Sequence, residues 1–233
     1  MGLFDALKVR KAVMLHNKGD LAGAKAAYEA LYADGVMDAA YLLPYTILLL
    51  REGNEADAEK VKEILRKVEK LPGLSAQQKT EIHINYACAQ YKLGNLPEAI
   101  HLLEASHKHS PTGILYETLG YLYVEAGDAE KGLPFNEEAL DYDDEDPITL
   151  DNMGQMYYRV LNDREKALPY FQKAVEIKEN QIDSLWFLSR YDLEKGDKAA
   201  AREKLETALG GRFSPLNYAS KEMVEKELDA LKE

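Results

Sequence analysis

Cysteine is almost absent from this sequence: Cys88 is the only one among 233 residues. Because an internal disulfide needs two cysteines, nothing requires an oxidising compartment, and we expect a cytoplasmic protein. Long apolar runs are also lacking. The longest, Ala39 to Leu50, contains Pro44 and falls well short of the roughly 20 residues that cross a bilayer. Asp5 and Lys8 stand where a signal peptide would need an apolar core. We therefore predict no membrane span and no secretion signal.

Basic charge is in deficit, with 29 Lys and Arg against 41 Asp and Glu and a net charge of −12. This balance opposes the phosphate neutralisation that supplies most nucleic-acid affinity, so we expect no nucleic-acid partner. The sequence also lacks a Gly-rich phosphate loop and a nucleophile elbow. His107 and His109 have no cysteine or carboxylate at a recognised metal-ligand spacing. We therefore predict no metal site, no cofactor and no enzyme activity.

One short pattern occurs six times along the chain, as in "LGNLPEA" from Leu93. Each copy has a turn residue followed by Asp or Asn, and then a small residue five positions after the turn. The turn residues are Gly19, Gly53, Gly94, Gly127, Asn162 and Gly196, separated by 34, 41, 33, 35 and 34 residues. The small residues are Ala24, Ala58, Ala99, Gly132, Ala167 and Ala201.

The chemistry of this pattern predicts helix hairpins. Gly, or Asn at position 162, can take the positive φ that ends a helix, and Asp or Asn can then cap the next helix. The small residue lets the second helix approach the first closely. In the longest interval, Pro72 and Gly73 mark a loop, and Ser75 with Gln78 resembles a capping box.

Two units carry a more specific pattern. One has Tyr116, Leu119, Gly120 and Tyr123, and the next has Leu150, Met153, Gly154 and Tyr157 followed by Ala167 and Phe171. This pattern resembles the tetratricopeptide repeat family. The resemblance implies an all-α, right-handed superhelical solenoid of antiparallel helix hairpins that acts as a non-enzymatic protein-protein interaction module, a scaffold or adaptor.

The expected organisation is one solenoid over residues 1–213 with about six repeats, followed by a C-terminal capping helix over 214–233. The repeat boundaries are approximately 5–37, 38–71, 75–111, 112–145, 146–180 and 181–213. Leu228 and Leu231 lie at helical spacing among charged residues near the end. A solenoid's last unit needs a polar outer face, which is why we interpret this stretch as a cap.

By the family resemblance, one stripe of each first helix lines a concave groove that holds a peptide or protein segment. Its predicted residues are Ile84, Asn85, Cys88, Tyr91, Lys92, Glu117, Thr118, Tyr121, Glu125, Asn152, Gln155, Tyr158, Arg159, Trp186, Phe187 and Arg190. Aromatic rings can bury a ligand's apolar side chains, and Asn side chains can pair with an extended backbone. The alternative is that these rings only pack between adjacent repeats.

Some relatives in this family grip acidic chaperone tails with a clamp of Lys, Asn and Arg. Asn85 and Asn152 match that pattern, but Ile84, Glu117 and Asp151 stand where a clamp Lys is expected. A desolvated carboxylate needs cationic partners, so the sequence disfavours this class of ligand.

A second candidate surface lies in the second repeat, whose first helix is apolar on nearly every side. Leu43, Ile47 and Leu50 fall on its groove stripe. Either the solenoid closes over them, or they form an apolar docking surface for a partner or a second copy, which would make the protein a self-associating homo-dimer. The N-terminal segment, with Phe4 and Leu7, is either the first helix of repeat 1 or a membrane-surface helix.

Overall fold

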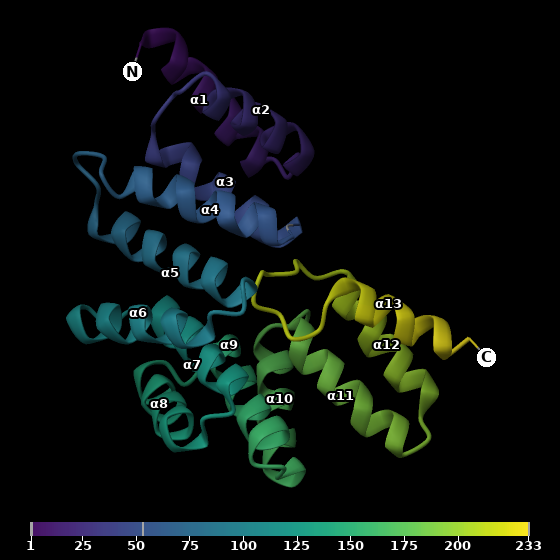
Figure 1. Cartoon of the computed structure of the whole chain (residues 1–233). Helices are drawn as coiled ribbons and strands as arrows, with labels where there is room; N and C mark the ends of the chain where they lie inside the picture. The colour runs from purple at the N-terminus through teal and green to yellow at the C-terminus, as the bar shows by residue number, and fades with distance from the viewer. Residues whose placement is uncertain (1, 53, 233) are drawn as a thin grey trace. The chain divides into compact units, whose positions relative to one another are not determined.

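The computed structural model describes residues 2–52 and 54–232, and all regular structure in this part of the chain is helical (Figure 1). Its helices are α1 (Leu3–Asn17), α2 (Leu21–Ala33), α3 (Ala39–Glu52), α4 (Glu55–Val68), α5 (Ala76–Lys92), α6 (Leu96–His109), α7 (Gly113–Ala126), α8 (Ala129–Tyr142), α9 (Pro147–Gln155), the π-helical turn η1 (Met156–Val160), α10 (Arg164–Ile177), α11 (Ile182–Glu194), α12 (Lys198–Leu209) and α13 (Lys221–Ala230). The predicted all-α fold is confirmed.

The chain divides into two compact units, Met1–Ser106 and His107–Glu233, called unit 1 and unit 2 below. In unit 1 the hairpins α1/α2 and α3/α4 are followed by α5 and α6, which a hydrogen bond between His83 Nδ1 and Ser106 Oγ joins at 2.8 Å. In unit 2 the hairpins are α7/α8, α9 and η1 with α10, and α11/α12. The N-terminal segment is thus the first helix of a hairpin, as one of the two hypotheses held.

The predicted turns are confirmed at every described position. Glycine takes a positive φ at the turns, 83° at Gly19 and 78° at both Gly94 and Gly196, and Gly127 also lies in this region. Asn162, at 52°, is the only non-glycine residue with a positive φ in the described residues. Gly53 lies outside them. After five of the turns, an Asp or Asn side chain accepts the backbone N–H three residues on: Asp20, Asn54, Asp128, Asp163 and Asp197.

The small residue after each turn is buried where the hairpin partners meet. Ala24, Ala99 and Ala167 are fully buried. Gly132 shows why the position must be small: a Cβ there would lie 2.9 Å from the Cβ of Tyr123 on the partner helix. Close helix approach, the predicted reason for this residue, is therefore confirmed.

The two longer intervals have different causes. The 41-residue interval contains the loop between α4 and α5, and the predicted capping box is present: Ser75 Oγ accepts from Gln78 N at 3.1 Å, and Gln78 Oε1 accepts from Ser75 N at 3.0 Å. The 35-residue interval contains η1, where Leu161 N donates to Met156 O, five residues back. A π-helical turn absorbs one extra residue in a helix, and such turns are frequent at functional sites.

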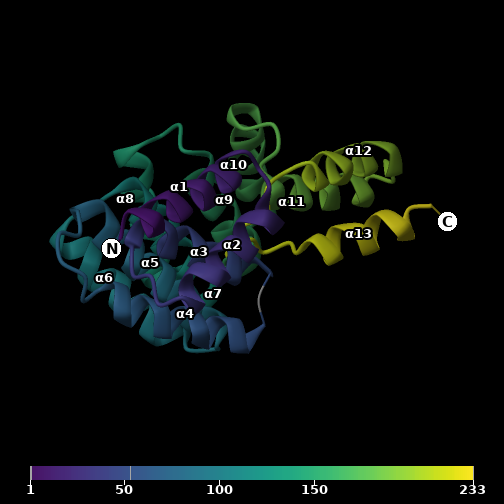
Figure 2. The same ribbon diagram turned by 90° about the horizontal axis from the view of Figure 1, so that it is seen from above.

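The C-terminal cap is shorter than predicted and begins with non-helical chain. Helix α13 starts after its cap Ser220, whose Oγ accepts from Met223 N at 3.2 Å. Its buried residues Val224 and Leu228 join a core cluster with Leu205 of α12, and α13 runs alongside that helix (Figure 2). The end of unit 2 is therefore covered. No helix in the described residues has the length and apolar character needed to cross a membrane.

Candidate functional site

The predicted groove residues lie on the first helices α5, α7, α9 with η1, and α11, where the repeat pattern places them. They differ in accessibility. The buried ones are Ile84, Asn85, Cys88, Thr118, Tyr121, Asn152, Gln155, Trp186 and Phe187. The half-buried ones are Tyr91, Lys92, Glu117, Glu125, Tyr158, Arg159 and Arg190. Only the half-buried set exposes a substantial part of its side-chain surface to solvent.

In each unit, one buried asparagine connects two consecutive first helices. In unit 1, Asn85 Nδ2 donates to Thr46 Oγ1 of α3 at 3.1 Å. In unit 2, Asn152 Nδ2 donates to the backbone oxygen of Glu117 on α7 at 2.9 Å. A buried amide that already has a partner stabilises the stacking of repeats, because leaving it unpaired would be costly. These amide contacts therefore hold the repeats together.

A polar network runs along the same stripe in unit 2. Arg159 Nη1, on η1, donates to Glu125 Oε1 of α7 at 2.6 Å and to Gln155 Oε1 at 2.8 Å. Gln155 Nε2 in turn donates to Asp151 Oδ2 at 2.7 Å. Ser184 Oγ of α11 donates to the other oxygen of Asp151. The network thus links the first helices of all three repeats of this unit.

One buried carboxyl group, Asp151, belongs to this network, and a second, Asp183, is its charged neighbour. Asp151 and Asp183 are 2% and 3% exposed. Burial, together with the neighbouring Asp183 charge, raises the pKa of Asp151 from 3.8 to about 8. Burial also raises the pKa of Asp183, although three hydrogen-bond donors oppose that shift. Because those donors stabilise the Asp183 carboxylate, we assign the proton at neutral pH to Asp151.

The three donors to Asp183 belong to the chain's own C-terminal segment, defined here as Ser214–Ser220. Asn217 Nδ2 and Tyr218 N donate to Asp183 Oδ2 at 3.1 and 3.0 Å, and Ala219 N donates to Oδ1 at 2.9 Å. The Tyr218 ring stacks on Phe187 with 5.1 Å between centroids and an interplanar angle of 24°. The Arg159 guanidinium carbon lies 4.1 Å from the Tyr218 ring centroid. A non-helical segment of turns and bends thus contacts part of the predicted stripe.

Glutamate residues near the stripe of unit 2 are partly or fully neutralised. Burial and the nearby Asp146 and Asp143 raise the pKa of Glu117 to about 7. Glu227 of α13 pairs with Arg190, with 3.0 Å between its Oε1 and Nη1. The carboxylate of Asp183, which accepts three N–H donors, is therefore the group of this stripe that favours a ligand with N–H donors.

In unit 1, several predicted residues lie inside the packed structure. Cys88 is 5% exposed, and burial raises the pKa of its thiol to about 12, so it stays a thiol at neutral pH. Leu43 and Leu50 are 2% and 1% exposed, whereas Ile47 is half-buried. Of the three predicted docking residues, only Ile47 is accessible to a partner.

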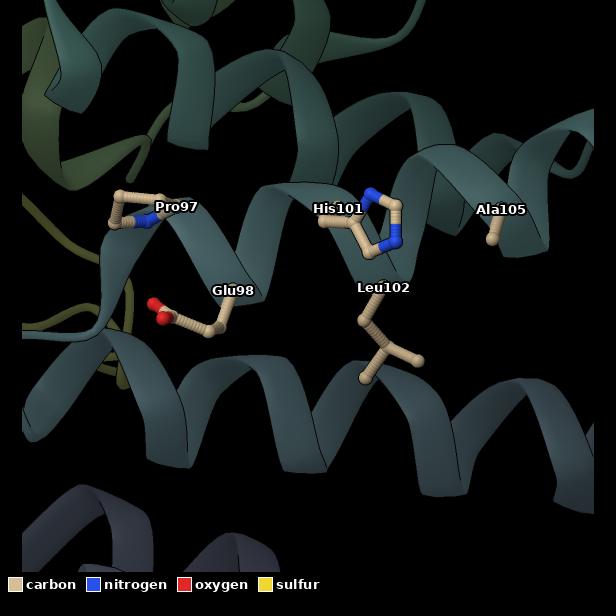
Figure 3. Close-up of a pocket in the computed structure, with 5 residues that line it drawn as sticks. All are labelled: Pro97, Glu98, His101, Leu102 and Ala105. Atoms are coloured by element: carbon tan, nitrogen blue, oxygen red, sulfur yellow. The ribbon is translucent and has the colours of Figure 1, made fainter.

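A shallow hollow lies elsewhere in unit 1, along one side of α6 (Figure 3). It is lined by Pro97, Glu98, His101, Leu102 and Ala105. All five residues come from a second helix, so the hollow is separate from the first-helix stripe. Among the described residues, no group of three His, Cys, Asp or Glu side chains is arranged to hold a metal ion.

Comparison with known proteins identifies one of the repeats. Residues 149–181, which comprise most of α9, η1 and α10, match the family described as tetratricopeptide repeat. This part of the chain is a tetratricopeptide repeat. The repeat that matches is the one in which Gly154 packs against Phe171 and which carries Arg159.

Solved tetratricopeptide repeat structures share this fold. The type IV pilus biogenesis factor PilW is 18% identical, with a TM-score of 0.64 over 97% of this chain and 100% of its own. A thermophilic tetratricopeptide repeat protein from Thermus thermophilus is 15% identical, with a TM-score of 0.56 over 98% of both chains. A chain of the APC/C hetero-tetramer Cut9-Hcn1 is 13% identical, with a TM-score of 0.67 over 98% of this chain and 43% of its own. At these identities the likeness concerns the fold alone.

One curated relative is similar in sequence: the Sol locus transcriptional repressor of Clostridium acetobutylicum, 30% identical over 102 residues. The aligned part covers 42% of this chain and 30% of that protein. The chain thus matches less than a third of the length of this relative.

Sequence reasoning missed the residues that meet at α11: Asp183, Asn217 and Tyr218. A signal was present in "SPLNYAS", because Pro215 and the cap residue Ser220 place this stretch before a helix rather than inside one. The pairing with Asp183 left no sequence signal, since it joins residues about 35 positions apart that follow no shared pattern.

Proposed function

We propose that this chain is a non-enzymatic interaction module that binds a peptide or a segment of a partner protein on the first helices of its repeats. One observation carries the proposal: helix α11 of unit 2 already holds a non-helical segment of the chain itself. Asp183 accepts two successive backbone N–H groups from it, and Phe187 stacks on its Tyr218 ring. Backbone hydrogen bonds with a slot for an aromatic side chain are a common means of peptide recognition.

The half-buried side chains support the same proposal. Tyr91 and Lys92 at the end of α5, and Tyr158 on η1, combine aromatic surface with charge. Such residues are enriched at binding surfaces because one end buries apolar area while the other stays hydrated. The Asp183 carboxylate favours a segment that presents N–H donors, in agreement with the missing carboxylate clamp. We place this activity in the cytoplasm, where the single free thiol of Cys88 is chemically compatible.

A library of random peptides displayed on phage and selected on the full chain tests this function. The selected peptides should bind Tyr91→Ala or Tyr158→Ala variants at least about tenfold more weakly than the wild type, because these residues lie on the stripe. The matched control is Tyr170→Ala, a half-buried tyrosine on the second helix α10, which should leave binding unchanged. If neither stripe variant weakens any selected peptide, the proposed function is wrong.

A second candidate, self-association, is favoured by exposed apolar residues on α1. Phe4, Leu7 and Met14 are 81%, 57% and 47% exposed, which is unusual for large apolar side chains on one helix. This surface lies in repeat 1, next to the second repeat that contains Leu43, Ile47 and Leu50. Light scattering over a wide concentration range should show dimers that a Phe4→Glu variant abolishes. A wild-type monomer at every concentration would exclude this candidate.

A further inference from the structure

The C-terminal segment contacts α11 in the way a bound peptide would. Its polar contacts with this helix converge on one carboxylate, Asp183. Two of the three donors are backbone N–H groups, which any non-proline residue can supply. Ser214–Ser220 forms no helix or strand of its own, and its residues before Ala219 are exposed or half-buried. The segment is therefore held by three hydrogen bonds to one carboxylate, by the contacts of the Tyr218 ring and by the burial of Ala219. These contacts are of a kind that another chain can reproduce.

We propose that the C-terminal segment is a self-ligand. It occupies a subsite made by Asp183, Phe187 and Arg159, and it thereby excludes partner segments of the same chemistry. The inference rests on the proposed function, because it names the ligand class for part of the same stripe. In this subsite, Asp183 accepts hydrogen bonds from the ligand backbone, and Phe187 and Arg159 contact the ligand's ring.

The contacts specify the ligand. Position 218 must supply a backbone N–H and an aromatic ring, and position 219 must supply a backbone N–H and a small side chain, since Ala219 is fully buried. Proline is excluded at both positions because it has no N–H. A side-chain N–H donor, as on Asn217, belongs before the ring. The partner segment is thus a non-helical peptide with the order amide or basic residue, aromatic residue, small residue.

Competition follows from the covalent link. A segment tethered to its own binding site acts at an effective concentration on the order of mM. A free peptide with the same contacts at micromolar concentration is therefore excluded from the wild-type subsite. A partner displaces the segment only if it makes further contacts along the stripe, for example at the half-buried Tyr158. The tether thus raises the selectivity of the module for long segments.

The test uses the full chain and a fluorescent peptide that copies residues 211–221. An Asn217→Ala/Tyr218→Ala variant, called the vacated variant, loses the amide donor and the ring but keeps the two backbone N–H groups. It should bind this peptide at least about tenfold more tightly than the wild type by fluorescence anisotropy, because the competing segment is held more weakly. A peptide with alanine in place of the tyrosine should show no gain. Adding Asp183→Asn to the vacated variant should abolish the gain.

Two controls keep the test specific. Arg212→Ala changes an exposed residue just before the segment and should bind the peptide no better than the wild type. Tyr218→Phe keeps the ring and both N–H groups, so its C-terminal segment should still occupy the subsite. Fluorescence of Trp186, the only tryptophan, reports whether unit 2 is folded. If the double variant is unfolded, the single Tyr218→Ala variant takes its place.

The proposal is overturned if a folded vacated variant binds the peptide no more tightly than the wild type. It is also overturned if the wild type forms dimers that the vacating substitutions abolish, because the natural occupant would then be the segment of a second copy. Neither outcome affects the phage-display result: peptides that depend on Tyr91 and Tyr158 would still establish the proposed function. The two failures are therefore distinguishable.

Discussion

Unit 1 and unit 2 use the same repeat pattern but fill their first helices differently. In unit 1, the core around α3 is aromatic and apolar: Tyr28, Tyr41 and Tyr45 are fully buried, and the Tyr28 ring lies 5.7 Å from that of Tyr41. In unit 2, the corresponding helices contain two buried carboxyl groups, Asp151 and Asp183, within a hydrogen-bonded network. The repeat pattern specifies the hairpins, whereas the side chains between the turns determine what the stripe can bind.

The buried carboxyl groups of unit 2 predict a pH dependence of its stability. A raised pKa means that folded Asp151 keeps its proton at pH values where the unfolded chain releases it. Its contribution to stability is fully present below about pH 4 and is lost as the pH rises towards about 8. The slope is at most about 1.4 kcal/mol per pH unit. Urea unfolding followed by Trp186 fluorescence between pH 5 and pH 8 measures it.

The control for the pH prediction is Asp151→Asn, which retains the shape but cannot ionise. It should flatten the pH profile of unit 2 while the far-ultraviolet circular dichroism of the whole chain at pH 5 stays the same. A wild-type profile that rises with pH over this range would contradict the assigned proton on Asp151.

Removing the acceptor of the C-terminal segment should have the next largest effect. Asp183→Ala leaves the N–H groups of Tyr218 and Ala219 without their partner, and we expect a loss of about 3 kcal/mol from the unfolding free energy of unit 2. The unit 1 counterpart, Asn85→Ala, removes one neutral hydrogen bond and should cost about 1 kcal/mol. Equal losses in urea titrations of the two variants would remove the contrast between the units.

Helix spacing gives a third contrast. At the position where unit 1 has Ala87, the fifth repeat has Gly154, and a Cβ there would lie 2.5 Å from an atom of the Phe171 ring. Gly154→Ala should therefore overpack the α9/α10 contact and cost about 2 kcal/mol. The melting temperature followed by Trp186 fluorescence checks this, and an unchanged value would mean that the ring shifts without strain.

The smallest expected effect is at Asn162, the only turn residue of the six that is not glycine. Its φ of 52° is strained for a side chain with a Cβ, so Asn162→Gly should stabilise unit 2 by about 0.5 kcal/mol. A destabilised variant would instead show that the Asn162 side chain contributes more than its backbone strain costs. Urea unfolding with the Trp186 probe has the sensitivity required.

The sequence predicted the hairpins well because their determinants are local. The positive φ at Gly94 or Asn162 and the cap at Asp163 each depend on a few neighbouring residues. Periodicity also placed the stripe residues on the first helices. It did not show which of them are buried. The side chains of Asn152 and Gln155 donate hydrogen bonds to Glu117 and Asp151, and their burial results from packing between repeats.

Two features were beyond sequence reasoning for the same physical reason. The protonation of Asp151 depends on burial and on the charge of Asp183, which is 32 positions away in the sequence. The occupied subsite depends on the segment around Tyr218 meeting α11, and such long-range contacts follow no period. The extra residue in the 35-residue interval did leave a trace, but spacing alone did not reveal the π-helical turn η1.

Amide hydrogen exchange tests the central claim, that the first-helix stripe of unit 2 binds peptide segments. Tyr218 N and Ala219 N are protected by Asp183 in the protein alone. When a phage-selected peptide that depends on Tyr158 is added to saturation, exchange at both amides should accelerate, because the peptide displaces the C-terminal segment. Saturating binding with unchanged exchange at Tyr218 and Ala219 would contradict the account.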